Sequence, residues 1–175
     1  QNHLKLIESM IKENVPNQLR YCKTMNEAYH LLHSYSTIGD FLAYQYVTDI
    51  NYSTLTNYSE MEFVKAGPGA KDGIAKCFKD FGGYSFEDII RLMADNQERE
   101  FDRLNIDFRN LWGRNLQLID CQNIFCEVDK YLRVANPEIS GYSKRTRIKQ
   151  KFTNQGSEPI EFYFPPKWGI NIIKA

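Results

Sequence analysis

Apolar residues recur every three or four positions along the first half of the chain, which is the spacing of one helix face. Residues 3–15 place four apolar side chains on such a face and end near a proline: Leu4, Ile7, Met10, Ile11 and Pro16. The next stretch begins at Thr24, with Glu27 three residues later as in a capping box. Residues 37–50 repeat the helical spacing at Ile38, Phe41, Leu42 and Tyr46.

The helical pattern continues after a glycine-rich segment. It predicts a helix over about 70–81, ended by Gly82 and Gly83. A further helix opens with Ser85 and Asp88, a second capping box, and is expected to bury Ile89, Leu92 and Met93. A long amphipathic stretch then ends before Pro137.

The composition changes at Pro137, where "GYSKRTRIKQKF" is basic and the remaining sequence is aromatic and broken by prolines. We therefore predict an all-α fold, with a helical DNA-binding or catalytic domain over residues 1–136. Residues 137–175 are expected to form an irregular basic and aromatic tail packed on the helices.

Length, composition and charge favour a globular, single-domain protein. The 175 residues fit one domain, and 42% hydrophobic residues favour a globular protein. The formal net charge is zero, so a polyanionic partner must be held by a local patch. The chain shows no signal peptide and no apolar run long enough for a membrane span, and because it begins at Gln1 it is compatible with an upstream segment. Four scattered cysteines favour a reducing intracellular compartment, cytoplasmic or nucleoid, over a disulfide framework; they are Cys22, Cys77, Cys121 and Cys126.

No metal site or nucleophilic hydrolase is indicated. His30 and His33 are three residues apart, but two ligands do not make a site. The chain has no GxSxG motif and no cysteine with an evident histidine partner. The sequence specifies no cofactor.

The segment "FVKAGPGAKDGIAKCF" raises the question of what approaches its glycines. Its spacing does not match a P-loop, and no strand precedes it. It does fit the G-x-G-x-K form of a helix-hairpin-helix turn, in which Gly67, Gly69 and Lys71 contact a DNA phosphate through the start of a helix. The alternative is a tight turn between helices that binds no ligand.

A second basic element lies in the tail, where five cations occur in eight residues: Lys144, Arg145, Arg147, Lys149 and Lys151. Such a run is either a solvated loop or a set of phosphate contacts.

The stretch "CEVDKYLR" concentrates charges within two helical turns. In general it would be a solvated face with a Glu127–Lys130 pair. In a catalytic site, Glu127 or Asp129 would act as general base and Lys130 would stabilise a phosphate leaving group. On the earlier helix, Gln45 and Asp49 are one turn apart, and Tyr44 or Tyr46 has the chemistry to stack on an extruded base. Gln45 alternatively caps a buried carbonyl.

Taken together, "IGDFLAYQYVTDINY", "AGPGAKDGIAKCF" and "CEVDKYLR" resemble the α-glutamyl/putrescinyl thymine pyrophosphorylases, or amino acid:DNA transferases. These share a helical region with 5-hydroxymethyluracil DNA kinases, and the family is remotely similar to helix-hairpin-helix DNA glycosylases. The resemblance spans residues 30–133. It implies a duplex DNA substrate with a flipped modified thymine, an amine that displaces pyrophosphate, and a fused or associated kinase as partner.

Two alternatives stay open. In a glycosylase, Lys71 would be the nucleophile and Asp120 the essential acid, although Asp120 lies farther from the glycines than the glycosylase pattern requires. In a non-catalytic module, the same helices would recognise modified DNA for a partner protein.

Overall fold

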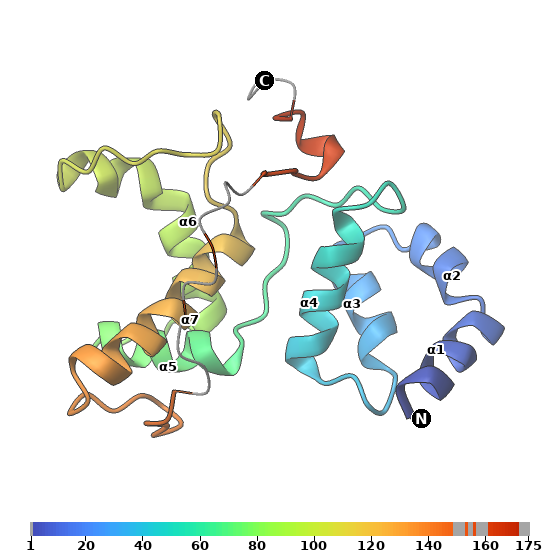
Figure 1. The fold of residues 1–175 in the computed structure, drawn as a ribbon, viewed down its shortest axis with the longest axis horizontal. Coiled ribbons are helices and arrows are strands. Elements are labelled where there is room, and N and C mark those ends of the chain that lie inside the picture. Colours follow the sequence, from blue (N-terminus) through green and yellow to red (C-terminus); the bar gives the residue numbers. More distant parts are fainter. Residues whose placement is uncertain (1, 149–152, 154–155, 157–160, 172–175) are drawn as a thin grey trace. The chain divides into compact units, whose positions relative to one another are not determined.

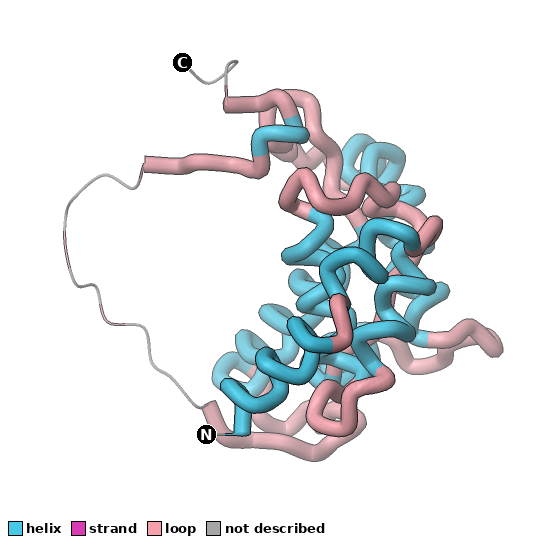
Figure 2. The backbone as a smooth tube through the Cα atoms, turned by 90° about the vertical axis from the view of Figure 1, so that its right-hand side faces the viewer, coloured by secondary structure: helices cyan, strands magenta, loops and turns pink. Residues whose placement is uncertain are grey.

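The computed structural model describes residues 2–148, 153, 156 and 161–171. Regular structure in these residues is helical, and their one strand-like feature is a single bridge between Leu111 and Arg114. Figure 2 shows the helices in cyan, joined by loops. The all-α prediction is confirmed for this part of the chain.

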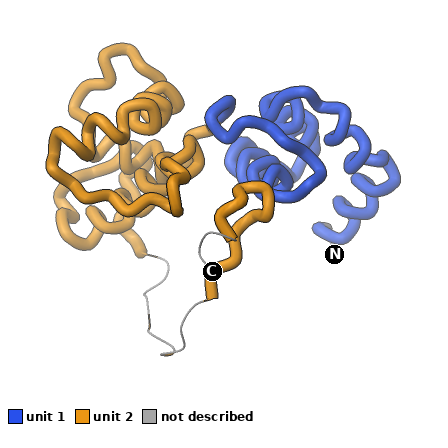
Figure 3. Tube along the Cα trace, turned by 90° about the horizontal axis from the view of Figure 1, so that it is seen from above, with its two compact units in different colours: residues 1–63 blue, residues 64–175 orange. Residues whose placement is uncertain are grey.

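The chain divides into two compact units, residues 1–63 and residues 64–175, coloured separately in Figure 3. Each unit has its own buried side chains and is described by itself. The sequence pattern placed a boundary only at residue 136 and gave no signal for a division near residue 63.

Unit 1 contains α1 (Asn2–Lys12), α2 (Val15–Tyr21), α3 (Met25–His33) and α4 (Asp40–Asn51), labelled in Figure 1. Thr24 caps α3 as predicted, because its side-chain oxygen accepts a hydrogen bond from the Glu27 N–H. The segment after α4 folds back on the unit. Asn51 exchanges hydrogen bonds with the backbone of Tyr58, and the Tyr58 hydroxyl donates to the carbonyls of Leu19 and Cys22.

Most of the apolar residues that mark the helical spacing of α1 and α4 lie outside the core. Leu4, Ile7 and Ile11 of α1 are exposed, and so are Phe41, Leu42 and Tyr46 of α4. α4 instead buries Ala43, Tyr44 and Val47. Because α4 carries apolar residues on two faces, helical spacing alone does not select the one that packs.

Unit 2 contains α5 (Pro68–Cys77), α6 (Phe86–Arg103), α7 (Leu118–Ala135) and a 3-10 turn, η1 (Pro166–Trp168). α5 is displaced from the predicted range 70–81, because Pro68 suits the first helical turn and the helix ends at Phe78. Gly82 and Gly83 lie beyond it, in a turn with positive φ. The Ser85–Asp88 capping box is confirmed, and Ile89 is buried as predicted. Leu92 and Met93 are exposed instead, and α6 also buries Ile90 and Ala94.

Two glycines allow α5 and α7 to lie side by side (Figure 1). A Cβ atom on Gly73 would lie 2.0 Å from the Phe125 carbonyl oxygen, and one on Gly69 would lie 3.0 Å from Cys126 Sγ. At Gly73 the Phe125 backbone is too close for any side chain, while a side chain at Gly69 would have to displace the Cys126 side chain slightly. What approaches the glycine segment is therefore, at least at Gly69 and Gly73, the next helix of the core.

We expect Gly73→Ala to destabilise the protein. The added methyl group must push α5 away from α7, which should lower the free energy of unfolding by about 2 kcal/mol or more despite the better helix propensity of alanine. Urea unfolding at neutral pH measures this. Gly39→Ala is the matched control, because a Cβ there meets nothing within 4 Å, and we expect a change below about 1 kcal/mol. Equal effects of the two substitutions would contradict the packing.

Candidate nucleic-acid interface

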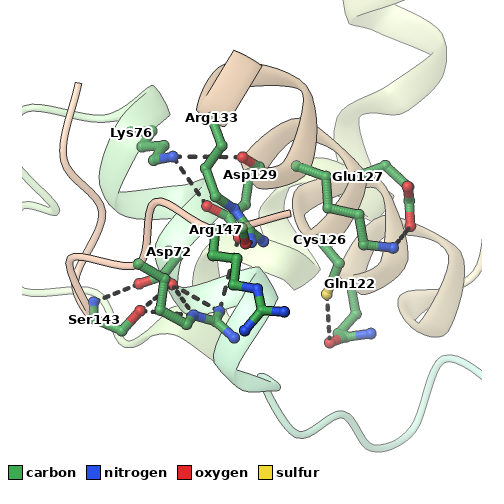
Figure 4. A network of polar contacts seen from close by, with 11 residues as sticks. Asp72, Lys76, Gln122, Cys126, Glu127, Asp129, Arg133, Ser143 and Arg147 are labelled. Atoms are coloured by element: carbon green, nitrogen blue, oxygen red, sulfur yellow. Dashed lines mark hydrogen bonds and ion pairs between the residues drawn. The ribbon is translucent and has the colours of Figure 1, made fainter. Parts of the chain in front are cut away.

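Unit 2 buries two aspartates, Asp72 on α5 and Asp129 on α7 (Figure 4), which are 1% and 0% exposed. A carboxylate removed from water is strongly unfavourable unless cations and hydrogen bonds surround it. The partners of these two side chains therefore determine how the neighbouring segments are arranged.

Asp129 is held between two cations. Its Oδ1 lies 3.0 Å from Lys76 Nζ on α5, and both side chains are 1% exposed. Its Oδ2 lies 2.5 Å from Nη2 of Arg133, one turn farther along α7. The Lys76 pair joins α5 to α7 at a point where water does not screen the attraction.

Asp72 holds a segment distant in sequence, residues 141–147, which we call the strap. The Ser143 N–H donates to Asp72 Oδ1 at 2.6 Å, and the Ser143 hydroxyl to Oδ2 at 2.5 Å. The Nη2 atom of Arg145 lies 2.7 Å from the same Asp72 oxygen, and it also lies 3.8 Å from Oδ2 of Asp129. Farther along, Nη1 of Arg133 donates to the carbonyl of Arg147 at 2.7 Å. The strap is thus attached to both buried carboxylates.

The backbone of the strap passes very close to the Asp72 side chain. A Cβ on Gly141 would lie 2.9 Å from the Cβ of Asp72, so only glycine lets the chain pass there. Lys144 has φ of 55°, a left-handed conformation that lysine rarely adopts. The turn exposes the Lys144 side chain.

The outer side of the strap is cationic. Lys144 and Arg147 are exposed and make no ion pair among the described residues, while Arg145 is 42% exposed. The strap contains no acidic residue. It also exposes Tyr142, whose ring contacts Phe86 edge to face at 5.9 Å.

Lys71 belongs to the same surface. Its Nζ lies 5.9 Å from the centre of the Phe86 ring, and that ring contacts Tyr142 of the strap. The fold thus brings the lysine of the glycine segment together with the basic run of the tail, two elements predicted separately. We call this set the basic strap surface: Lys71, Tyr142, Lys144, Arg145 and Arg147. Lys149 and Lys151 of the predicted basic run lie outside the described residues.

The charged residues of "CEVDKYLR" separate onto two sides of α7. Glu127 and Lys130 form an exposed pair at 2.5 Å, whereas Asp129 points into the protein (Figure 4). An open groove of about 480 Å³ follows the outer face of α7, and Asp120 and Glu127 line it while Asp129 does not.

Asp120 takes part in the N-terminal cap of α7. Its Oδ2 accepts the Gln117 N–H at 2.8 Å and lies 3.2 Å from Nη1 of Arg114. A catalytic role for Asp120, Glu127, Asp129 or Lys130 stays a prediction.

The predicted phosphate contact at Gly67 and Gly69 also stays a prediction. The Gly67 N–H donates to the Gln122 Oε1 at 3.2 Å, and Gly67 is buried. Residues 52–67, which precede α5, contain no helix, so the glycines do not follow a short turn from α4.

The remaining predicted residues belong to unit 1. Tyr44 is 1% exposed and packs against Phe63, with ring centres 6.0 Å apart. Gln45 has a buried Nε2 with no hydrogen-bond partner among the described residues, and Asp49 is exposed. Base contact by Tyr44 or Gln45, and catalysis by Asp49, stay predictions.

Sequence reasoning missed Asp72, Lys76, Gly141 and Ser143. Asp72 lies one residue from Gly73, inside the segment that drew attention for its glycines, but its partners are more than 70 residues away. No local pattern links them.

The described part of the chain offers neither a metal site nor a membrane-spanning helix. There, no three His, Cys, Asp or Glu side chains gather as a metal site would require. None of the helices described is both long enough and apolar enough to cross a membrane.

Comparison with known proteins identifies the family. The family model for the helical domain of 5-hmdU DNA kinase matches residues 1–141, which include the seven α-helices of the described residues. The chain belongs to this family of helical domains.

One relative is the 5-hmdU DNA kinase of Bacillus phage SP10, which is 26% identical over 137 residues. The aligned region covers 73% of this chain and 21% of the relative, so the chain spans about a fifth of that protein's length. No solved structure gives a significant match.

The strap should depend on the charge of Asp72. Burial raises the pKa of this carboxyl, but the hydrogen bonds from Ser143 and Arg145 and the Arg145 charge outweigh it, and the pKa lies below its ordinary value of 3.8. A lowered pKa means that the ionised form contributes stability above the ordinary value, and that this contribution is lost as pH falls through the folded pKa.

We therefore expect Asp72→Asn to lower the free energy of unfolding by about 2 kcal/mol at pH 7, with a difference from the native chain that shrinks below about pH 4. Urea unfolding of both proteins between pH 7 and pH 3 measures the difference. A difference independent of pH would show that the ionised carboxylate does not hold the strap.

Proposed function

We propose that this chain is a DNA-binding helical domain that holds DNA containing 5-hydroxymethyluracil for enzymes acting on the modified base. The observation that carries the proposal is the basic strap surface, fixed to the fold through Asp72 and Asp129. The family supports the choice of modified base, because its description names 5-hmdU DNA kinase.

The strap surface has the chemistry that DNA phosphates require. Arginine guanidinium groups bind phosphate oxygens through planar paired donors, and lysine adds a mobile point charge. A chain with zero net charge has no general attraction for DNA, so a local set of cations must supply it. Because Ser143 and Arg145 are fixed on Asp72, the strap does not have to be ordered when DNA binds, which favours affinity.

Such contacts position DNA without reading its sequence. The 5-substituent of a thymine-type base lies in the major groove, on the edge that carries the methyl group. A domain that grips the backbone leaves this substituent accessible to a second protein or domain. We propose that a fused or associated kinase is that partner, in keeping with the name of the phage relative.

Binding has more support than catalysis by this chain. Amine transfer in place of pyrophosphate would need an accessible general base beside a cation that binds the leaving group. Asp129 is buried between Lys76 and Arg133, and Glu127 is paired with Lys130 on an exposed face. Base excision would need Asp120, which caps α7. These two activities stay as alternatives that the same DNA substrates test.

We expect the chain to bind a duplex that contains 5-hydroxymethyluracil, with an affinity that falls steeply with salt. Replacing Lys144, Arg145 and Arg147 with Gln should reduce the slope of log K against log salt by about 3, because each of the three lost phosphate contacts removes about 0.9. Fluorescence anisotropy with a labelled duplex measures the slope, over a salt range of about 50 to 200 mM in which the affinity changes strongly.

Two further variants separate geometry from charge. Gly141→Ala keeps every charge but forces the strap off Asp72, and should also weaken binding. Arg99→Gln removes an exposed cation on α6 and should leave binding unchanged. Equal slopes for the native chain and the triple variant would contradict the proposal. A mass gain in the duplex after incubation with an amine would instead favour transfer, and loss of a base would favour excision.

A further inference from the structure

We propose that unit 2 carries a second nucleic-acid contact, an aromatic platform that stacks on unpaired bases. The platform consists of the exposed rings of Trp112 and Phe162, together with Phe164, which contacts both. This inference rests on the proposed function, because it names the state of the DNA that the domain takes.

Trp112 lies at the tip of a strained turn. Leu111 and Arg114 form a bridge, and the two residues between them, Trp112 and Gly113, have φ of 49° and 91°. A two-residue turn with positive φ at both central positions favours Asn or Gly at the first, because a bulky side chain is strained there. The tryptophan is nevertheless 44% exposed, so burial of its ring does not fully compensate the strain. Strain of this kind, at an exposed aromatic residue, points to a functional constraint.

The turn is fixed by polar contacts. The Gly113 N–H donates to Asn110 Oδ1 at 2.8 Å. The guanidinium of Arg114 lies 3.8 Å from the centre of the Trp168 ring, and its Nη1 lies 3.2 Å from Asp120 Oδ2 at the start of α7. The turn that presents Trp112 is therefore anchored to α7.

The segment 161–171 supplies the other rings. Phe164 contacts Trp112 edge to face at 5.8 Å and lies nearly parallel to Phe162, with ring centres 6.1 Å apart and an interplanar angle of 2°. The Phe164 backbone is held by Asn171, which accepts from its N–H at 2.9 Å and donates to its carbonyl at 2.7 Å. The Phe162 ring is then left 56% exposed.

An unpaired base is the ligand that fits these rings. Flat exposed aromatic side chains stack on bases whatever their sequence, and that requires a free base face, which a base inside a duplex does not offer. The platform is attached near Asp120 at the start of α7, and the strap near Arg133 at its end. At 1.5 Å per residue these points are about 20 Å apart along α7, a distance that a few nucleotides span. The two contacts thus suit a strand held by its phosphates at one end and by its bases at the other.

The test compares single-stranded and duplex DNA on the whole chain. Trp112→Asn should weaken binding of a labelled oligothymidine by about tenfold, while leaving duplex binding nearly unchanged. Its thermal unfolding midpoint should not fall, because Asn suits the turn better than Trp. Trp112→Phe keeps a ring and should retain most of the affinity. Tyr21→Ala, which removes an exposed ring on α2 of unit 1, is the control and should have no effect.

The outcomes separate this inference from the proposed function. If the triple strap variant loses duplex binding while Trp112→Asn binds oligothymidine as the native chain does, the platform is wrong and the strap stands. If Trp112→Asn weakens oligothymidine binding while the strap variant keeps its salt slope, the platform stands and the phosphate role of the strap is wrong. A Trp112→Asn variant that loses both ligands equally would also overturn selective stacking on unpaired bases.

Discussion

Two buried carboxylates set the arrangement of unit 2. Carboxylates buried as deeply as Asp72 and Asp129 need cations at close range, and the chain supplies three: Lys76, Arg133 and Arg145. Removing one partner of such a group leaves an uncompensated buried charge, which is far more costly than losing an exposed pair. The network therefore gives the strap one favoured position on the helices, although it draws on residues from three separate parts of the sequence.

The network depends in turn on how closely α5 and α7 approach. Gly69 and Gly73 remove the side chains that would hold these helices apart, and Lys76, on the same helix as Gly73, then reaches Asp129. The ion network thus requires the close packing of α5 and α7, and the position of the strap requires the ion network. The family match ends at Gly141, the first residue of the strap. The helices therefore belong to the shared domain, while residues 142–147 of the strap and the aromatic segment 161–171 lie beyond the matched region.

Local features could be predicted from the sequence, and distant pairings could not. The Thr24 cap and the Ser85–Asp88 capping box are correct because their partners lie within one helical turn. On α6 the predicted burial is right for Ile89 and wrong for Leu92, because Leu92 continues an apolar spacing that the core does not use. Phe41 does the same on α4. The division into two units could not be predicted, because the composition does not change near residue 63.

The candidate site shows the same limit. The sequence predicts Lys71 and Arg145 separately as phosphate contacts. The surface that they share depends on Asp72, whose partners lie more than 70 residues away. The family resemblance identified the class of helical domain correctly, as the match over residues 1–141 shows. Chain topology, which brings residue 72 to residue 143, cannot be read from spacing.

The central claim is that the strap meets the DNA backbone. Hydrogen–deuterium exchange of the chain, with and without a duplex containing 5-hydroxymethyluracil, tests it most directly. The account predicts slower exchange of backbone amides in residues 141–147 when DNA is bound, with no comparable change at residues 67–70. Protection confined to residues 67–70, with unchanged exchange in the strap, would contradict it.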